Sequence, residues 1–209
     1  MKTDYINNIP NAERRFFSVP LEFRASEDGK QYFEGYAAKF NQETDLGYFR
    51  EMIAPGAFSE VLNDDVRCLF NHDSHVILGR TQSGTCEISV DEVGLKYRAL
   101  YNENDPDHVR VMEKIKRGDV SQSSFAFTID RESWTNPKEG EQTSLRTIEV
   151  VRQLYDVSPV TYPAYADTTV GARGLESIKA EKDKADEAAA KEKSEQLRQK
   201  YKLKLQLTK

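Results

Sequence analysis

Residues 120–130 read VSQSSFAFTID, and this stretch gives the clearest indication of the fold. Alternate side chains of a β-strand point to opposite faces, so a strand here places Phe125 and Phe127 on one face. Ser124 and Ala126 then share the other face, which is small and polar. The aromatic face is suited to covering a core. The small face leaves room for a peptide backbone to approach a hydroxyl group.

Similar strand-like runs extend on both sides of this stretch, and short turn signals such as Ser83-Gly84 and Asn136-Pro137 separate them. We therefore expect an α+β protein that is mainly antiparallel β, folded as a barrel or sandwich with a few flanking helices. The expected strands read FFSVPLEFRA, QYFEGYAAKF, DVRCLFNH, TCEISVDEVGLKYRALY, SSFAFTID and RTIEVVRQLYDVSPVTYP.

Two helices are expected between the strands. Residues 106–116 carry apolar side chains at Val109, Met112 and Ile115, which have helical spacing, and Arg117-Gly118-Asp119 follows as a stop signal. A shorter helix is expected where PGAF at residues 55–58 leads into SEVLN.

The composition indicates a polar protein with one sizeable core. The chain has 209 residues, of which 38% are hydrophobic and 31% charged. No apolar run approaches the roughly 20 residues that cross a bilayer, and the N-terminus lacks the apolar segment of a secretory signal. These features predict a cytoplasmic protein with no membrane partner. Cys68 and Cys86 lack metal-site spacing and are expected to be buried thiols.

Three segments are expected along the chain: a flexible leader at residues 1–15, a body at residues 16–174 and a charged helical tail at residues 175–209. The tail contains 10 basic and 7 acidic residues, so it carries +3 and leaves −8 on the rest of a chain whose net charge is −5. An acidic body offers no broad field for phosphate backbones, which argues against a nucleic-acid partner. The tail is either a solvated helix or a tether that presents the body to a partner.

The residues that could carry chemistry are few. Of the three histidines, His108 lies in an acidic helix start where solvent exposure is expected, whereas His72 and His75 lie beside a turn and both remain candidates. Ser124 is the favoured serine, because Ser121 and Ser123 share the phase of the phenylalanines. The residues alone, however, favour the alternative that Ser124 is a small polar residue on an outer face. Asp156 interrupts the strand-like run VVRQLYDVSPVTYP, which indicates a polar partner or surface exposure.

Six pieces of the chain, taken in order, resemble the prohead (capsid maturation) proteases of tailed bacteriophages, serine peptidases similar to herpesvirus assemblin. The resemblance covers about two thirds of the chain, from about residue 33 to residue 173. The pieces are GYAAKFN, REMIAPGAFSEVL, LFNHDSHVILGR, GLKYRALYN, IKRGDVSQSSFAF and LYDVSPVTYPAY.

The resemblance implies a catalytic triad of His72, Ser124 and Asp156 on a herpesvirus-protease-like β-barrel. The family acid is often glutamate, so Asp156 is one methylene shorter than that residue. The resemblance also implies cleavage of scaffold, of N-terminal segments of the major capsid protein and of the enzyme itself, inside the immature capsid in the host cytoplasm. Self-association, for example as a homodimer, is implied by analogy with assemblin-like relatives.

No metal or cofactor is expected, because the chain has neither a nucleotide-binding loop nor a zinc motif. Backbone N–H groups are expected to form the oxyanion hole, with Arg152 or Arg173 as candidate aids. Two alternatives stay open: an inactive capsid assembly or scaffolding module with the same fold, and a cysteine hydrolase that uses Cys68 or Cys86.

Overall fold

The structure is a computed structural model that describes residues 5–18, 20–26, 29–137, 141, 143–162 and 191. The chain divides into two compact units, residues 1–166 and 167–209. All elements listed below belong to the first unit. The predicted tail at residues 175–209 lies outside the described residues apart from Lys191, which is helical and exposed.

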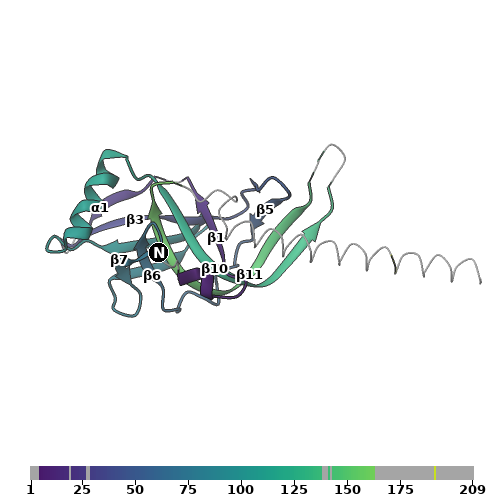
Figure 1. Ribbon diagram of the computed structural model, residues 1–209, viewed down its shortest axis with the longest axis horizontal. Helices are drawn as coiled ribbons and strands as arrows, with labels where there is room; N and C mark the ends of the chain where they lie inside the picture. Colours follow the sequence, from purple (N-terminus) through teal and green to yellow (C-terminus); the bar gives the residue numbers. More distant parts are fainter. Residues whose placement is uncertain are drawn as a thin grey trace, which may run out of the picture. The chain divides into compact units, whose positions relative to one another are not determined.

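Most of the elements described in the first unit are strands (Figure 1). The described elements are η1 (Tyr5–Asn8), β1 (Glu13–Phe17), β2 (Glu22–Ala25), β3 (Gln31–Lys39), β4 (Thr44–Asp45), β5 (Arg50–Ile53), β6 (Arg67–Phe70), β7 (Asp73–Arg80), β8 (Cys86–Val90), β9 (Gly94–Leu100), α1 (Pro106–Arg117), β10 (Gln122–Thr135) and β11 (Leu145–Val160).

The strands form two sheets, and within the described residues neither sheet closes into the barrel that the sequence led us to expect. One sheet has the order β1-β10-β11-β5-β4, with β6 pairing with both β11 and β7; the other has the order β2-β3-β9-β8. The pairing is antiparallel except where β11 pairs with β5 and with β6. β11 is long enough to take these two short parallel partners in succession along one edge, which makes the large sheet mixed.

The β10–β11 ribbon has two different faces, which decide both the core and the site. The register sets Phe125 opposite Val157, and these two side chains, together with Phe127, form what we call the core face. Ser124 lies opposite Ser158, and with Asp156 this pair forms the polar face. The alternation predicted for residues 120–130 is therefore confirmed.

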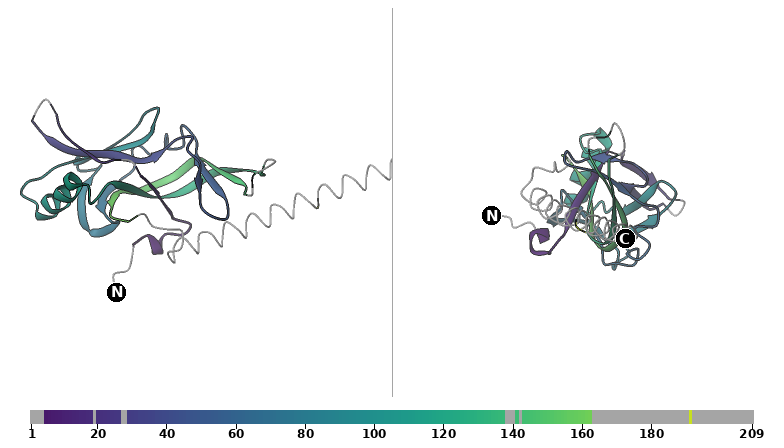
Figure 2. Two further views of the ribbon diagram at one scale, coloured as in Figure 1. Left: turned by 90° about the horizontal axis from the view of Figure 1, so that it is seen from above. Right: turned by 90° about the vertical axis from the view of Figure 1, so that its right-hand side faces the viewer.

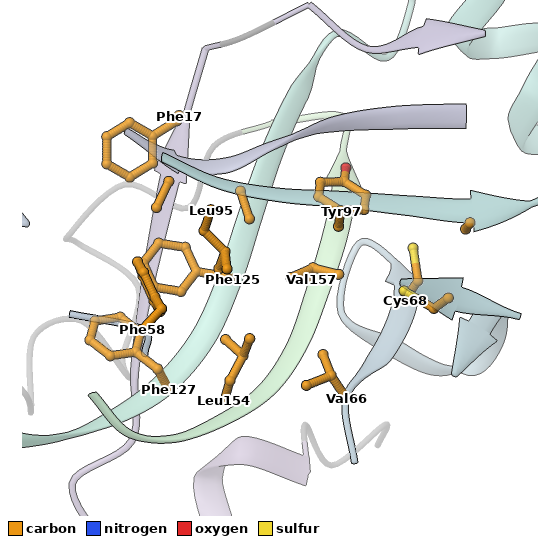
Figure 3. Close-up of a cluster of buried hydrophobic side chains, with 14 of the residues drawn as sticks. Phe17, Phe58, Val66, Cys68, Leu95, Tyr97, Phe125, Phe127, Leu154 and Val157 are labelled. Carbon is orange, nitrogen blue, oxygen red and sulfur yellow. The ribbon is translucent and has the colours of Figure 1, made fainter. Parts of the chain in front are cut away.

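Aromatic side chains fill the core beneath the core face (Figure 3). Phe125 stacks on Phe127 with ring centroids 4.6 Å apart, and Phe58 meets Phe125 edge-on at 5.6 Å. Leu154 lies in the same cluster. Each such side chain contributes about 1.5–3 kcal/mol by leaving water, so this packing holds β10 and β11 in fixed positions.

The longer predicted helix is confirmed as α1. Asp105 caps its first turn by accepting a hydrogen bond from the backbone N–H of Asp107, and Gly118 ends it with a φ of 82°. The buried stripe differs in one position from the prediction: Val111 is buried beside Met112 and Ile115, whereas Val109 is 37% exposed. Among the described residues no helix is long and apolar enough to span a membrane.

The shorter predicted helix, at residues 59–63, is wrong. The chain between Pro55 and Leu62 forms successive turns in which N–H groups bond three residues back, as Ser59 does to Gly56 and Val61 to Phe58. Gly56 has a φ of 86°, which lies outside the right-handed helical region. The turns bury Phe58 and Val61 in the core.

Two regular elements lie within residues 5–17. Of the residues expected to form a flexible leader, Tyr5–Asn8 form η1 and Glu13 begins β1. β1 leads from the purple end of the chain to the edge of the large sheet, where it pairs antiparallel with β10 (Figure 2). Ile6 is buried. This segment therefore lies beside the strand that carries Ser124.

Candidate active site

His72 occupies the two-residue turn that joins β6 to β7. Phe70 pairs with Asp73 across the turn, and Asn71 and His72 have φ values of 53° and 56°. Positive φ at both central residues is the pattern of a type I′ hairpin, and asparagine and histidine are among the residues enriched at positive φ. The Asn71 side chain stabilises the turn by accepting hydrogen bonds from the backbone N–H and the hydroxyl of Thr161, both at 2.9 Å.

This turn brings the imidazole between Ser124 and Asp156. His72 Nδ1 lies 2.7 Å from Asp156 Oδ1, and His72 Nε2 lies 2.7 Å from Ser124 Oγ. The residues come from β10, β11 and the β6–β7 turn, so three separate parts of the chain converge. With Nδ1–H donated to the carboxylate, Nε2 is free to accept the hydroxyl proton, which is the arrangement that activates a serine.

The polar face supplies the serine and the acid on adjacent strands. Ser124 and Asp156 are buried, with exposed fractions of 1% and 0%. Ser158, two residues after Asp156, points to the same side and donates its hydroxyl hydrogen to Asp156 Oδ1 at 2.9 Å. β6 also pairs with β11 at Asp156 and Val157, which ties the histidine-bearing hairpin to the strand that carries the acid.

Asp156 is held as a carboxylate although it is fully buried. Burial raises its pKa, but the charge and hydrogen bond of His72 lower it, and so does a hydrogen bond from the Tyr5 hydroxyl. The positive charge of Arg14 acts in the same direction, and the net result is a pKa below the ordinary value of 3.8. An ionised acid in this position can stabilise an imidazolium.

The nucleophile has a second neighbour on β1. Ser124 Oγ lies 2.9 Å from the backbone carbonyl oxygen of Arg15, which can accept its hydrogen. A hydroxyl carries one hydrogen, so the Arg15 carbonyl and His72 Nε2 compete for it. β1 thus contacts the reacting atom directly.

The other histidines do not meet the serine. His75 lies in β7 rather than in a turn, its side chain is 77% exposed, and its ring contacts Asp73. His108, which the sequence led us to expect in solvent, is buried, and burial lowers its pKa. Ser123 is hydrogen bonded to Tyr97 on the opposite side of β10. Of the candidates open from the sequence, the structure brings together His72, Ser124 and Asp156.

The cysteines lie in the core, as expected. Cys68 and Cys86 are both buried and free. Burial raises the pKa of the Cys68 thiol well above its ordinary value, and a hydrogen bond with Cys86 acts in the same direction. A buried thiol of this kind is a poor nucleophile, so the geometry gives no support to the cysteine-hydrolase alternative.

The two arginines suggested for the oxyanion hole are not in the site as described. Arg152 is exposed and pairs with Asp130 on the surface. Arg173 lies outside the described residues. Within the described ranges, no group of three or more histidine, cysteine or acidic side chains is placed to hold a metal ion.

Sequence reasoning missed three partners of the triad: Ser158, Tyr5 and the Arg15 carbonyl. The strand period could have identified Ser158, because residues two apart on a strand share a face. Tyr5 gave no signal, because it is far from Asp156 in sequence and its role depends on the path of the chain through η1 and β1.

Comparison with known proteins places the chain in a family. It is similar to the capsid assembly protease of bacteriophage T4, gp21, with 16% identity and a TM-score of 0.46 over 75% of this chain and 100% of that one. A comparison with curated proteins found no match. A model of the caudovirus prohead serine proteases matches residues 19–183. Because that match covers most of the chain, the chain belongs to the caudovirus prohead serine protease family.

Proposed function

We propose that this peptidase is a serine endopeptidase in which Ser124 is the nucleophile, His72 the general base and Asp156 the residue that orients His72. The observation that carries the proposal is the pair of 2.7 Å contacts that His72 makes, one to Ser124 Oγ and one to Asp156 Oδ1. Such a hydrogen-bonded series is what nucleophilic catalysis by serine requires.

The proposed reaction has two steps. Ser124 Oγ attacks the carbonyl carbon of the scissile peptide while His72 Nε2 takes the hydroxyl proton. The imidazolium then gives this proton to the departing amine as the C–N bond breaks, leaving an acyl ester on Ser124. Water, deprotonated by His72, then attacks the ester, and the imidazolium returns the proton to Ser124 Oγ as the Oγ–C bond breaks and the acid product leaves. Asp156 stays ionised throughout and stabilises the imidazolium.

The family has a role in capsid maturation, and we propose the targets accordingly. They are scaffold, the N-terminal segment of the major capsid protein and the protease itself. The proposed place of action is the immature capsid in the host cytoplasm, with self-association of the protease as a further expectation.

The test is to express the full chain with its coat and scaffold proteins and to map the cleaved peptides by mass spectrometry. Wild type is compared with Ser124→Ala and with Ser59→Ala, which removes an exposed hydroxyl from a surface turn. We expect cleavage with wild type and Ser59→Ala and none with Ser124→Ala. Cleavage that continues with Ser124→Ala would exclude this nucleophile, and a wild type that assembles without cleaving would favour the inactive assembly module.

We further propose that residues 175–209 present the enzyme to the scaffold or are removed by self-cleavage. The net charge of +3 on this segment, against −8 on the remaining chain, supports a role separate from catalysis. To test this, we would measure how much of a variant that lacks residues 176–209 is incorporated into procapsids. Reduced incorporation is expected, whereas normal incorporation with normal self-cleavage would remove the tail's proposed role.

A further inference from the structure

The N-terminal segment, residues 5–17, contacts two members of the triad. The Tyr5 hydroxyl donates a hydrogen bond to Asp156 Oδ2, and the Arg15 carbonyl lies 2.9 Å from Ser124 Oγ. The family match begins only at residue 19, so these contacts come from a part of the chain that the family model does not cover. Two contacts to different triad members indicate that the segment belongs to the site rather than lying near it by chance.

Buried ion pairs hold this segment in place. On β1, Arg15 pairs with Glu51, and Glu13 pairs with Arg146 at 2.9 Å. The partners on β5 and β11 are almost fully buried, with exposed side-chain fractions of 4% for Glu51 and 3% for Arg146. Displacing β1 would break these two buried ion pairs, although Glu51 and Arg146 would still pair with each other at 3.0 Å. The ion pairs and the strand pairing of β1 with β10 therefore anchor the segment to the fold.

Asp156 has a hydrogen-bond donor on each of its oxygens. Oδ1 receives His72 Nδ1–H and the Ser158 hydroxyl, while Oδ2 receives the hydroxyl of Tyr5. A carboxylate bonded through only one oxygen can rotate about its terminal bond and tilt the imidazole. A second donor on the other oxygen fixes that rotation, as outer hydrogen bonds fix catalytic groups elsewhere.

We propose that Tyr5 is a positioning residue for catalysis: its hydroxyl holds Asp156, and through Asp156 it holds His72 in line with Ser124. Residues 5–17 thereby form an integral wall of the catalytic centre. The proposal rests on the triad assigned above. It also requires that a mature, active enzyme retains this segment, so self-cleavage between residue 5 and residue 17 would inactivate the enzyme.

The test compares Tyr5→Phe with Tyr48→Phe in the full chain. Tyr48 is 70% exposed, so the second variant removes a phenol hydroxyl from the surface. The probe is a peptide that carries a cleavage site mapped in the coat or scaffold protein. For Tyr5→Phe we expect kcat to fall about 10-fold with KM unchanged, as for one lost hydrogen bond. Tyr48→Phe should match wild type.

The pH profile separates positioning from a purely structural role. A carboxylate with one donor fewer holds the imidazolium more strongly, so the acid limb of kcat/KM should move to higher pH in Tyr5→Phe. Replacing Tyr5 with 3-fluorotyrosine keeps the ring and strengthens the donor, so the limb should move the other way. If Tyr5→Phe does not fold, the 3-fluorotyrosine variant alone tests whether Tyr5 positions Asp156.

The outcomes separate the two proposals. If wild type is active and depends on Ser124, but neither change at Tyr5 alters kcat or the acid limb, the role of Tyr5 is overturned while the triad stands. A fall in Tm with an unchanged acid limb also overturns it, because Tyr5 would then act only in folding. An inactive wild type, or an active Ser124→Ala, would instead overturn the triad itself.

Discussion

The two faces of the β10–β11 ribbon are almost equally buried, yet they are held by different forces. The core face presents Phe125, Phe127 and Val157, which need only close packing. The polar face presents Ser124 and Asp156, which are buried to the same degree and are tolerated there because hydrogen bonds satisfy them. The core face should therefore govern stability and the polar face catalysis, and each of the following changes tests that separation.

The largest expected effect comes from removing the base without disturbing its turn. His72→Asn keeps a residue that accepts positive φ and that can still donate to Asp156, but it has no imidazole. We expect kcat to fall by about 10⁶-fold, with little change in the free energy of unfolding. Residual activity above about 1% of wild type would mean that another group serves as base.

Replacing the acid by its amide should have the next largest effect. Asp156→Asn removes the charge that stabilises the imidazolium and the acceptor that fixes its tautomer, so kcat should fall by about 10⁴-fold. Asp130→Asn, at an exposed position on β10, is the matched control and should retain full activity. Equal kcat in both variants would contradict the role of Asp156.

On the core face the effect should appear in stability instead. Phe127→Ala leaves a cavity beneath β10 and should lower the free energy of unfolding by about 3–5 kcal/mol, as measured by urea denaturation. The kcat of the folded Phe127→Ala protein should fall far less than the kcat of Asp156→Asn. If Phe127→Ala cost no stability, the assignment of the core face would be wrong.

Lowering the pH should reduce stability through the buried carboxylates, and this loss of stability should be smaller than the effects of the substitutions above. The pKa values of Asp156 and Glu13 lie below their ordinary values of 3.8 and 4.5. Their contribution to stability is fully present above those ordinary values and is lost as the pH falls through the lower, folded-state pKa values. The Tm should therefore fall as the pH is lowered below these ordinary values, and it should fall less in Asp156→Asn. An equal drop in that variant would mean that Asp156 makes no such contribution.

The parts of the fold that the sequence predicted are those set by local periodicity. The alternation around Phe125 separated the core face from the polar face, and the spacing of Met112 and Ile115 predicted α1. The short helix expected at residues 59–63 is instead part of a series of turns whose N–H groups bond three residues back, as Ser59 does to Gly56 and Val61 to Phe58. The arrangement of the strands in two sheets could not be predicted from local patterns, because β11 pairs in parallel with segments that are distant in the sequence.

The sequence by itself determined which chemical groups were available and which strand faces carried them, because side-chain direction along a strand follows from its period of two. The residue pattern left His72 and His75 both open, and the family resemblance implied His72. The tertiary structure gives the physical reason why His72 rather than His75 meets Ser124, which is a turn with positive φ and the pairing of β6 beside Asp156. It also decided that Tyr5 reaches the buried acid. Contacts between residues far apart in the chain depend on how the strands pair, and no local pattern encodes that pairing.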